Sequence, residues 1–212
     1  MSKRKKVASI AFTGIAAVTA VGFRAGTALA ASGTWKITPN GAYQAENSTS
    51  ATLIANGTKL TCEPGTATAS GALKATGTGT SPTIGSIKTA AFGTTDSPCT
   101  LAGLVNFTAT LNKPLNIVAK SYNATTGVAT GHLAGDISAT LTGNACTAKV
   151  TGASIPVSFN NGTHLLDINP KSASTLTIRS VTGCEGLIKS GEAAGFHAKY
   201  LTSLSDLTIT QS

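Results

Sequence analysis

Hydrophobic and polar residues alternate with a period of two along most of the chain. The pattern is clear at 129–133, at 175–179 and at 207–210, where apolar residues alternate mainly with Thr. Thr is β-branched and favours extended backbone, while its hydroxyl group can face water. A strand with one buried and one solvated face is typical of antiparallel sheets. The chain is therefore predicted to be all-β, as an antiparallel β-sandwich or a barrel-like fold.

Turn signals separate the predicted strands. Asn56-Gly57 and Asn161-Gly162 predict tight hairpins, because both residues of such a turn need a positive φ. Residues 65–86 are rich in Gly, Thr and Ser, and we expect a flexible edge or a long loop there. No long helical period is present, and single helical turns are expected only around Thr100–Leu104 and Glu185–Lys189.

The first thirty residues have the features of a secretory signal peptide. A basic start at 3–6 precedes a mildly apolar run at 7–23, and Ala28-Leu29-Ala30 supplies the small residues of a cleavage site after Ala30. The alternative is an N-terminal membrane anchor, but the apolar run is shorter than the ~20 residues that a spanning helix needs. We predict that residues 1–30 are removed and that residues 31–212 form one secreted domain without a membrane span.

Removal of the leader changes the charge of the protein. The whole chain carries +8, from 16 Lys and Arg against 8 Asp and Glu, and five of those cations precede residue 31. The remaining 11 cations are never adjacent in sequence. Binding of nucleic acid, or of an anionic membrane surface, requires clustered cations. We therefore expect neither as a partner.

All four cysteines lie in the predicted secreted part. An even number of Cys in an exported chain indicates disulfides. The chain contains no Cys-x-x-Cys pair, the spacing that would indicate a metal site. The separations are similar, 37 residues from Cys62 to Cys99 and 38 from Cys146 to Cys184. Of the three possible connectivities, this similarity favours Cys62–Cys99 and Cys146–Cys184. It also suggests two related halves, 31–135 and 136–212.

Residues suited to catalysis are few. Charged residues make up 11% of the chain, and neither Gly-x-Ser-x-Gly nor His-Glu-x-x-His occurs. His132 and Asp136 are four residues apart and His164 and Asp167 three apart, but on a strand neither spacing brings the two side chains together. We therefore predict a protein without catalytic residues, cofactor or metal.

Aromatic rings are the remaining binding candidates. Sugar-binding β proteins need exposed rings, and Trp35, Tyr43 and Tyr122 could serve in that role. The alternative for each is packing in the core, with Trp35 beside Ile37.

Four short segments carry a resemblance to a known group of proteins. They are Thr34–Gly41, Leu60–Cys62, Ser121–Val128 and Gly183–Ile188, and with the four Cys in register they resemble small secreted proteins of filamentous actinobacteria. The resemblance implies export and shared disulfides, and it implies no activity.

Three functions are compatible with these observations. The first is a secreted, non-catalytic β protein for extracellular or cell-surface interaction, or an envelope component, with a protein or polysaccharide partner. The second is a secreted hydrolase built from scattered acids and His. The third is a β-barrel that binds a small apolar ligand, which a closed sheet with an apolar cavity would favour.

Overall fold

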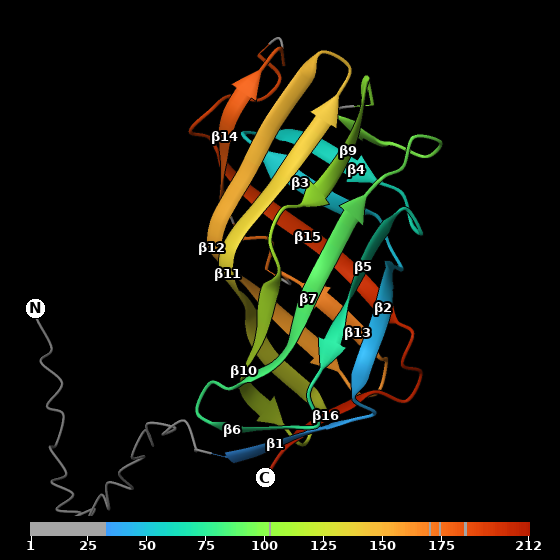
Figure 1. Cartoon of the computed structure of the whole chain (residues 1–212), viewed down its shortest axis with the longest axis vertical. Coiled ribbons are helices and arrows are strands. Elements are labelled where there is room, and N and C mark those ends of the chain that lie inside the picture. The colour runs from blue at the N-terminus through green and yellow to red at the C-terminus, as the bar shows by residue number, and fades with distance from the viewer. Residues whose placement is uncertain (1–32, 102, 170, 174, 185) are drawn as a thin grey trace, which may run out of the picture.

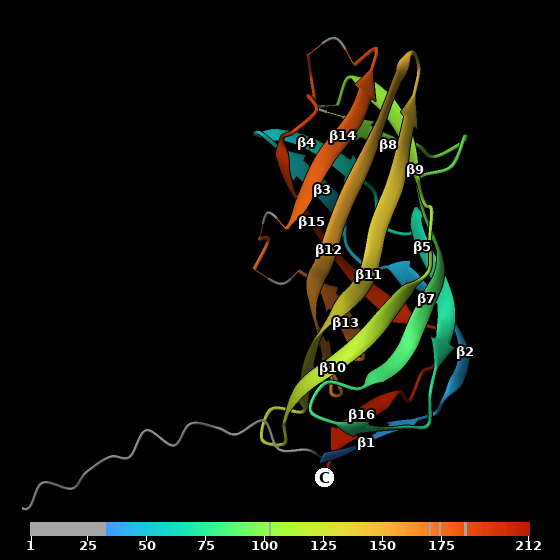
Figure 2. The same cartoon turned by 60° about the vertical axis from the view of Figure 1, so that its left-hand side comes forward.

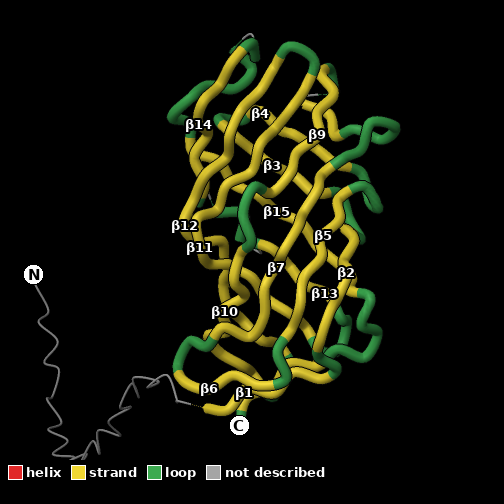
Figure 3. Tube along the Cα trace, viewed as in Figure 1, coloured by secondary structure: helices red, strands yellow, loops and turns green. Residues whose placement is uncertain are grey.

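The computed structural model describes residues 33–212 except for 102, 170, 174 and 185, and the predicted signal peptide lies outside these residues. The described residues form antiparallel strands, as predicted, and contain no helix (Figures 1 and 3). It follows that no helix able to cross a membrane occurs among them. The strands are β1 (Gly33–Thr38), β2 (Gly41–Asn47), β3 (Ala51–Ala55), β4 (Thr58–Cys62), β5 (Ala67–Leu73), β6 (Thr76–Gly79), β7 (Thr83–Phe92), β8 (Cys99–Leu101), β9 (Val105–Leu111), β10 (Leu115–Asn123), β11 (Val128–Gly143), β12 (Cys146–Asn160), β13 (Leu165–Ile168), β14 (Leu176–Thr182), β15 (Ala193–Thr202) and β16 (Thr208–Gln211).

The main sheet closes on itself. The long strands β11 and β12 pair along most of their length, and their outer edges change partners half-way along. At one end the pairings run β12-β11-β10-β7-β5-β2-β15-β13 and back to β12. At the other end they run β12-β11-β9-β8-β4-β3-β15-β14 and back to β12. The fold is therefore barrel-like, and each ring has eight strands.

The second sheet covers one end of the closed sheet. Strands β16, β1 and β6 pair in that order and lie across the end below β7 and β10 (Figures 1 and 2). Trp35 and Ile37 project from β1 to the inside and are fully buried, which puts Trp35 beside Ile37 as the core alternative predicted. Both side chains belong to the same hydrophobic core as the inward-facing residues of the closed sheet.

The partner change on β11 coincides with an irregularity. The register between β11 and β12 shifts between Ala134 and Ile137, and Gly135 has a φ of +129° that favours glycine. The suggested boundary between two halves, after residue 135, lies at this point inside a single strand. The duplication stays a prediction.

Both predicted disulfides are present. Cys62–Cys99 joins β4 to β8 with a Cα–Cα distance of 4.2 Å, and Cys146–Cys184 joins the start of β12 to the segment that follows β14. Strands β4 and β8 pair only through Leu60 with Leu101 and Thr61 with Thr100 in the described part of the chain. The Cys62–Cys99 bridge therefore reinforces one of the shortest ladders of the closed sheet.

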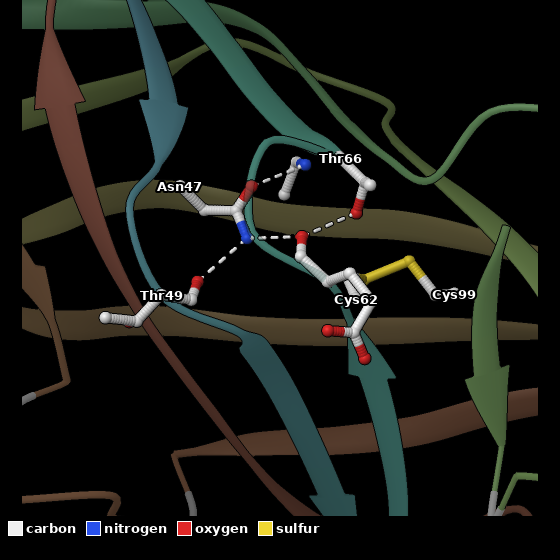
Figure 4. Close-up of a disulfide and its surroundings, with 7 residues drawn as sticks. Asn47, Thr49, Cys62, Thr66 and Cys99 are labelled. Carbon is white, nitrogen blue, oxygen red and sulfur yellow. Dashed lines mark hydrogen bonds between the residues drawn. A yellow bond between two sulfur atoms is a disulfide. The ribbon is translucent and has the colours of Figure 1, made fainter. Parts of the chain in front are cut away.

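A buried asparagine holds the chain beside this disulfide (Figure 4). Asn47 is 2% exposed. Its Nδ2 donates to the carbonyl oxygens of Thr49 at 2.8 Å and Glu63 at 2.9 Å, and its Oδ1 accepts from Ala67 N at 2.7 Å. These bonds satisfy backbone groups where the chain leaves β2, follows β4 and enters β5.

Some local expectations were wrong. Residues 65–86 contain β5, β6 and the start of β7 rather than a long loop, whereas the alternative of an edge agrees with the position of β6 at the edge of the three-stranded sheet. Thr100–Leu104 begins as strand β8, and among its described residues Leu104 N bonds to Leu101 O in a turn. Of the expected turn at Glu185–Lys189, residue 185 lies outside the described residues, and Leu187 N bonds to Cys184 O in a turn. A helix needs such bonds in succession.

The two hairpin signals had different outcomes. Asn56 and Gly57 both have positive φ, as the tight turn requires. At Asn161-Gly162 the loop is longer, and the positive φ belongs to His164. Asn161 instead bonds across to Ile209, with Nδ2 donating to its carbonyl oxygen and Oδ1 accepting from its N–H.

Candidate functional site

The interior of the closed sheet contains a cavity of about 110 Å³. Its wall consists of Ala, Leu, Ile, Val and Phe side chains, together with Tyr43, Tyr200 and the disulfide-bonded Cys62. No charged side chain lines it among the described residues. A cavity with such a wall excludes ions and attracts apolar molecules.

The cavity results from small residues at inward-facing positions. An eight-stranded ring has an interior that side chains can just fill, or that holds one small ligand. Here six inward positions carry only a methyl group, where a Leu or Ile would occupy the space: Ala45, Ala51, Ala69, Ala90, Ala109 and Ala139. The alternating pattern therefore provides a hydrophobic interior, and its alanines leave that interior incompletely filled.

The residues that line the cavity extend along the closed sheet. Leu133 and Leu141, both on β11, line it, and their separation of eight residues corresponds to about 26 Å along a strand, or about 20 Å along the axis of a barrel with tilted strands. For comparison, an engineered cavity of about 150 Å³ holds benzene. Because the lining residues extend over this length, an extended alkyl chain can contact more of the wall than a compact ring can.

Two tyrosines supply the hydroxyl groups of the wall. Tyr43 donates to the carbonyl oxygen of Ser86 at 3.2 Å. Tyr200 is 4% exposed, and its hydroxyl makes no hydrogen bond with any described residue. Burial raises the pKa of both phenols, because the charged form loses its hydration. Both are therefore neutral near pH 7.

The three rings predicted as binding candidates are not gathered on one exposed face. Trp35 and Tyr43 are buried, at 0% and 5% exposure, and only Tyr122 on β10 is half-buried. Tyr43 faces the cavity, while Trp35 belongs to the end cap and Tyr122 packs against the edge of the core. The burial of Trp35 and Tyr43 excludes both from stacking on a sugar.

The His and Asp residues that lie close in sequence do not pair in the fold. Asp136 forms an exposed ion pair with Lys113, which lowers the pKa of Asp136 mainly through a hydrogen bond. His164 Nδ1 lies 3.1 Å from the carbonyl oxygen of Leu207. Asp136 and His164 thus each contact a residue other than the one suggested by sequence proximity, as the strand spacing predicted.

Asp167 instead meets His197, a pairing that sequence reasoning missed. His197 Nε2 lies 3.2 Å from Asp167 Oδ1, across β15 and β13, and both side chains are partly buried on the outer face of the sheet. No group of three His, Cys, Asp or Glu able to hold a metal is found among the described residues. The pair is a contact between the neighbouring strands β13 and β15.

Comparison with known proteins does not add a functional clue. No protein-family model matches the chain, and no curated protein or solved structure matches it significantly.

Proposed function

We propose that this protein is an exported, non-catalytic binding protein that holds a small, uncharged apolar molecule inside its closed sheet. The observation that carries the proposal is the cavity of about 110 Å³ with an apolar wall and no charged side chain among the described residues. It favours the ligand-binding alternative over a hydrolase, which would need acids or a Ser and His in a cleft.

The apolar wall and the length over which its residues extend support an unbranched alkyl compound as the ligand class. Each methylene group transferred from water into an apolar site contributes about 0.8 kcal/mol, so the affinity should rise about fourfold per added carbon. The increase should end when the chain exceeds the length of the cavity. A surface-binding site would show no such limit.

Titration with alkanes from pentane to octane tests the proposal. Bound ligand should shift the methyl NMR signals of Leu133 and Leu141, which lie far apart on β11 but line one cavity. The variant Ala109→Leu fills part of the cavity and should lose binding at least tenfold. Thr110→Leu changes the adjacent, exposed position on β9 and should bind as the wild type does. Unchanged methyl signals in the wild type, or equal binding by both variants, would contradict the proposal.

Export is supported by the leader pattern of residues 1–30 and by the two disulfides. Mass spectrometry of the protein from its native source should give a chain that starts at Ala31 and carries no free thiol. The same sample, extracted with organic solvent, should release the apolar compound. A chain that retains Met1 to Ala30 and four thiols would contradict export.

A further inference from the structure

The cavity wall contains one polar group that the protein itself leaves unpaired. Tyr200 lines the cavity from β15 and is 96% buried, since its exposure is 4%. Its hydroxyl makes no hydrogen bond with any described residue. The buried polar side-chain atoms without a hydrogen-bond partner in the described residues are Trp35 Nε1 and Asp167 Oδ1, so the Tyr200 hydroxyl is not fully buried. It keeps a small accessible surface and a hydrogen atom that no described residue accepts, and it can donate that hydrogen atom to a molecule that reaches it.

Tyr43 provides the contrast within the same wall. Its hydroxyl donates to Ser86 O at 3.2 Å, so its hydrogen atom is already used by the protein. Gly71 allows this contact, because a Cβ at that position would lie 1.9 Å from Ser86 O and 2.9 Å from the Tyr43 hydroxyl. The protein thus provides a hydrogen-bond acceptor for the Tyr43 hydroxyl and none for the Tyr200 hydroxyl.

We infer that the Tyr200 hydroxyl anchors the polar end of the ligand, which is an uncharged, unbranched alkyl compound with one hydrogen-bonding oxygen, as in an alcohol or a ketone. The inference rests on the proposed function and specifies its ligand class. Tyr200 donates its proton to the ligand oxygen in a hydrogen bond, and the alkyl chain lies along the apolar wall. No covalent bond is made or broken, and no charge enters the cavity.

The absence of countercharge argues against an anionic ligand. A carboxylate in an apolar site needs a cation or several donors to replace its hydration. Among the described residues, the wall has no Lys, Arg or His, and the Tyr43 donor is occupied. Burial also raises the pKa of Tyr200, which keeps its proton available for donation. A single neutral donor suits one neutral oxygen.

Hexane, 1-hexanol and hexanoate at pH 7 separate the possibilities. They are titrated into the disulfide-bonded protein and into the variants Tyr200→Phe and Tyr43→Phe, and methyl NMR reports each dissociation constant. Tyr200→Phe should weaken 1-hexanol binding about tenfold and leave hexane binding unchanged, because only the alcohol loses a hydrogen bond. Tyr43→Phe should leave the ratio of the two affinities as in the wild type.

Other results would overturn the inference. They are equal effects of Tyr200→Phe on both ligands, no effect on either, or tighter binding of hexanoate than of 1-hexanol. If the wild type binds none of the three compounds, the proposed function itself fails, which is a different result. A second experiment uses the wild type alone. The carbonyl ¹³C signal of bound 2-hexanone should move to higher frequency than in hexane solution, and an unmoved signal would also overturn the inference.

Discussion

Filling the cavity from Ala109 should stabilise the protein. Ala109 is 7% exposed on β9, and its methyl group lines the cavity. The variant Ala109→Leu adds three carbons, worth about 2 kcal/mol if they occupy apolar space that is empty without ligand. Ordering the longer side chain costs about 0.5–1 kcal/mol. The net expected gain in the free energy of unfolding is about 1–2 kcal/mol.

Urea unfolding of the ligand-free, oxidised protein measures this gain as a higher midpoint at an unchanged m-value. The control Thr110→Leu places the same side chain on the exposed face, where the change should stay within about 0.5 kcal/mol. A packed interior would give the opposite result, since inserting carbons into a filled core costs about 1–3 kcal/mol. A lower midpoint for Ala109→Leu than for Thr110→Leu would therefore refute the existence of usable space at this position.

Three further predictions concern individual contacts between residues. Asn47→Ala removes three hydrogen bonds to backbone groups and should lower the free energy of unfolding in urea by about 3 kcal/mol. The control Asn123→Ala lies at an exposed turn, where Oδ1 accepts from Thr125 and Thr126, and it should cost less than about 1 kcal/mol. Equal costs would contradict the role of burial. The double variant Cys62→Ala/Cys99→Ala opens a loop with a sequence separation of 37 and should lose about 4 kcal/mol, and a loss below about 1 kcal/mol would show that the closed sheet does not depend on the bridge. NMR titration should find the pKa of Asp136 below that of a free aspartate, and Lys113→Met should raise this pKa. Because the pKa is lowered in the folded state, the contribution of the ion pair to stability is present at neutral pH and is lost as the pH falls through the lowered pKa. An identical pKa of Asp136 in both proteins would refute the pairing.

The local properties of the chain were predictable from sequence. Alternation at 175–179 and 207–210 places Leu176, Ile178 and Ile209 in the interior, because successive side chains of a strand point to opposite faces whatever the rest of the fold is. The disulfide pairing also followed from sequence, through two similar separations. Single hydrogen-bonded turns near 104 and 187 were mistaken for helical turns, because one i to i+3 bond has the same local signature in both.

The candidate site was not predictable in this way. Tyr200 looks like any other aromatic residue of a strand, and the inward alanines look like small residues in a tight core. Whether they leave space depends on the diameter of the ring, which is set by how many strands close it and how they tilt. The meeting of His197 with Asp167 likewise depends on β15 lying beside β13, a pairing between distant segments.

The sequence by itself determined that this protein is an all-β chain with two disulfides, because strand periodicity and cysteine spacing are properties of the chain. Only the tertiary structure decided that the sheet closes, that its interior retains an apolar cavity, and that one phenol in the wall lacks a partner. Those features depend on the combined volume and positions of side chains from strands that are far apart in sequence, and no local pattern contains that sum.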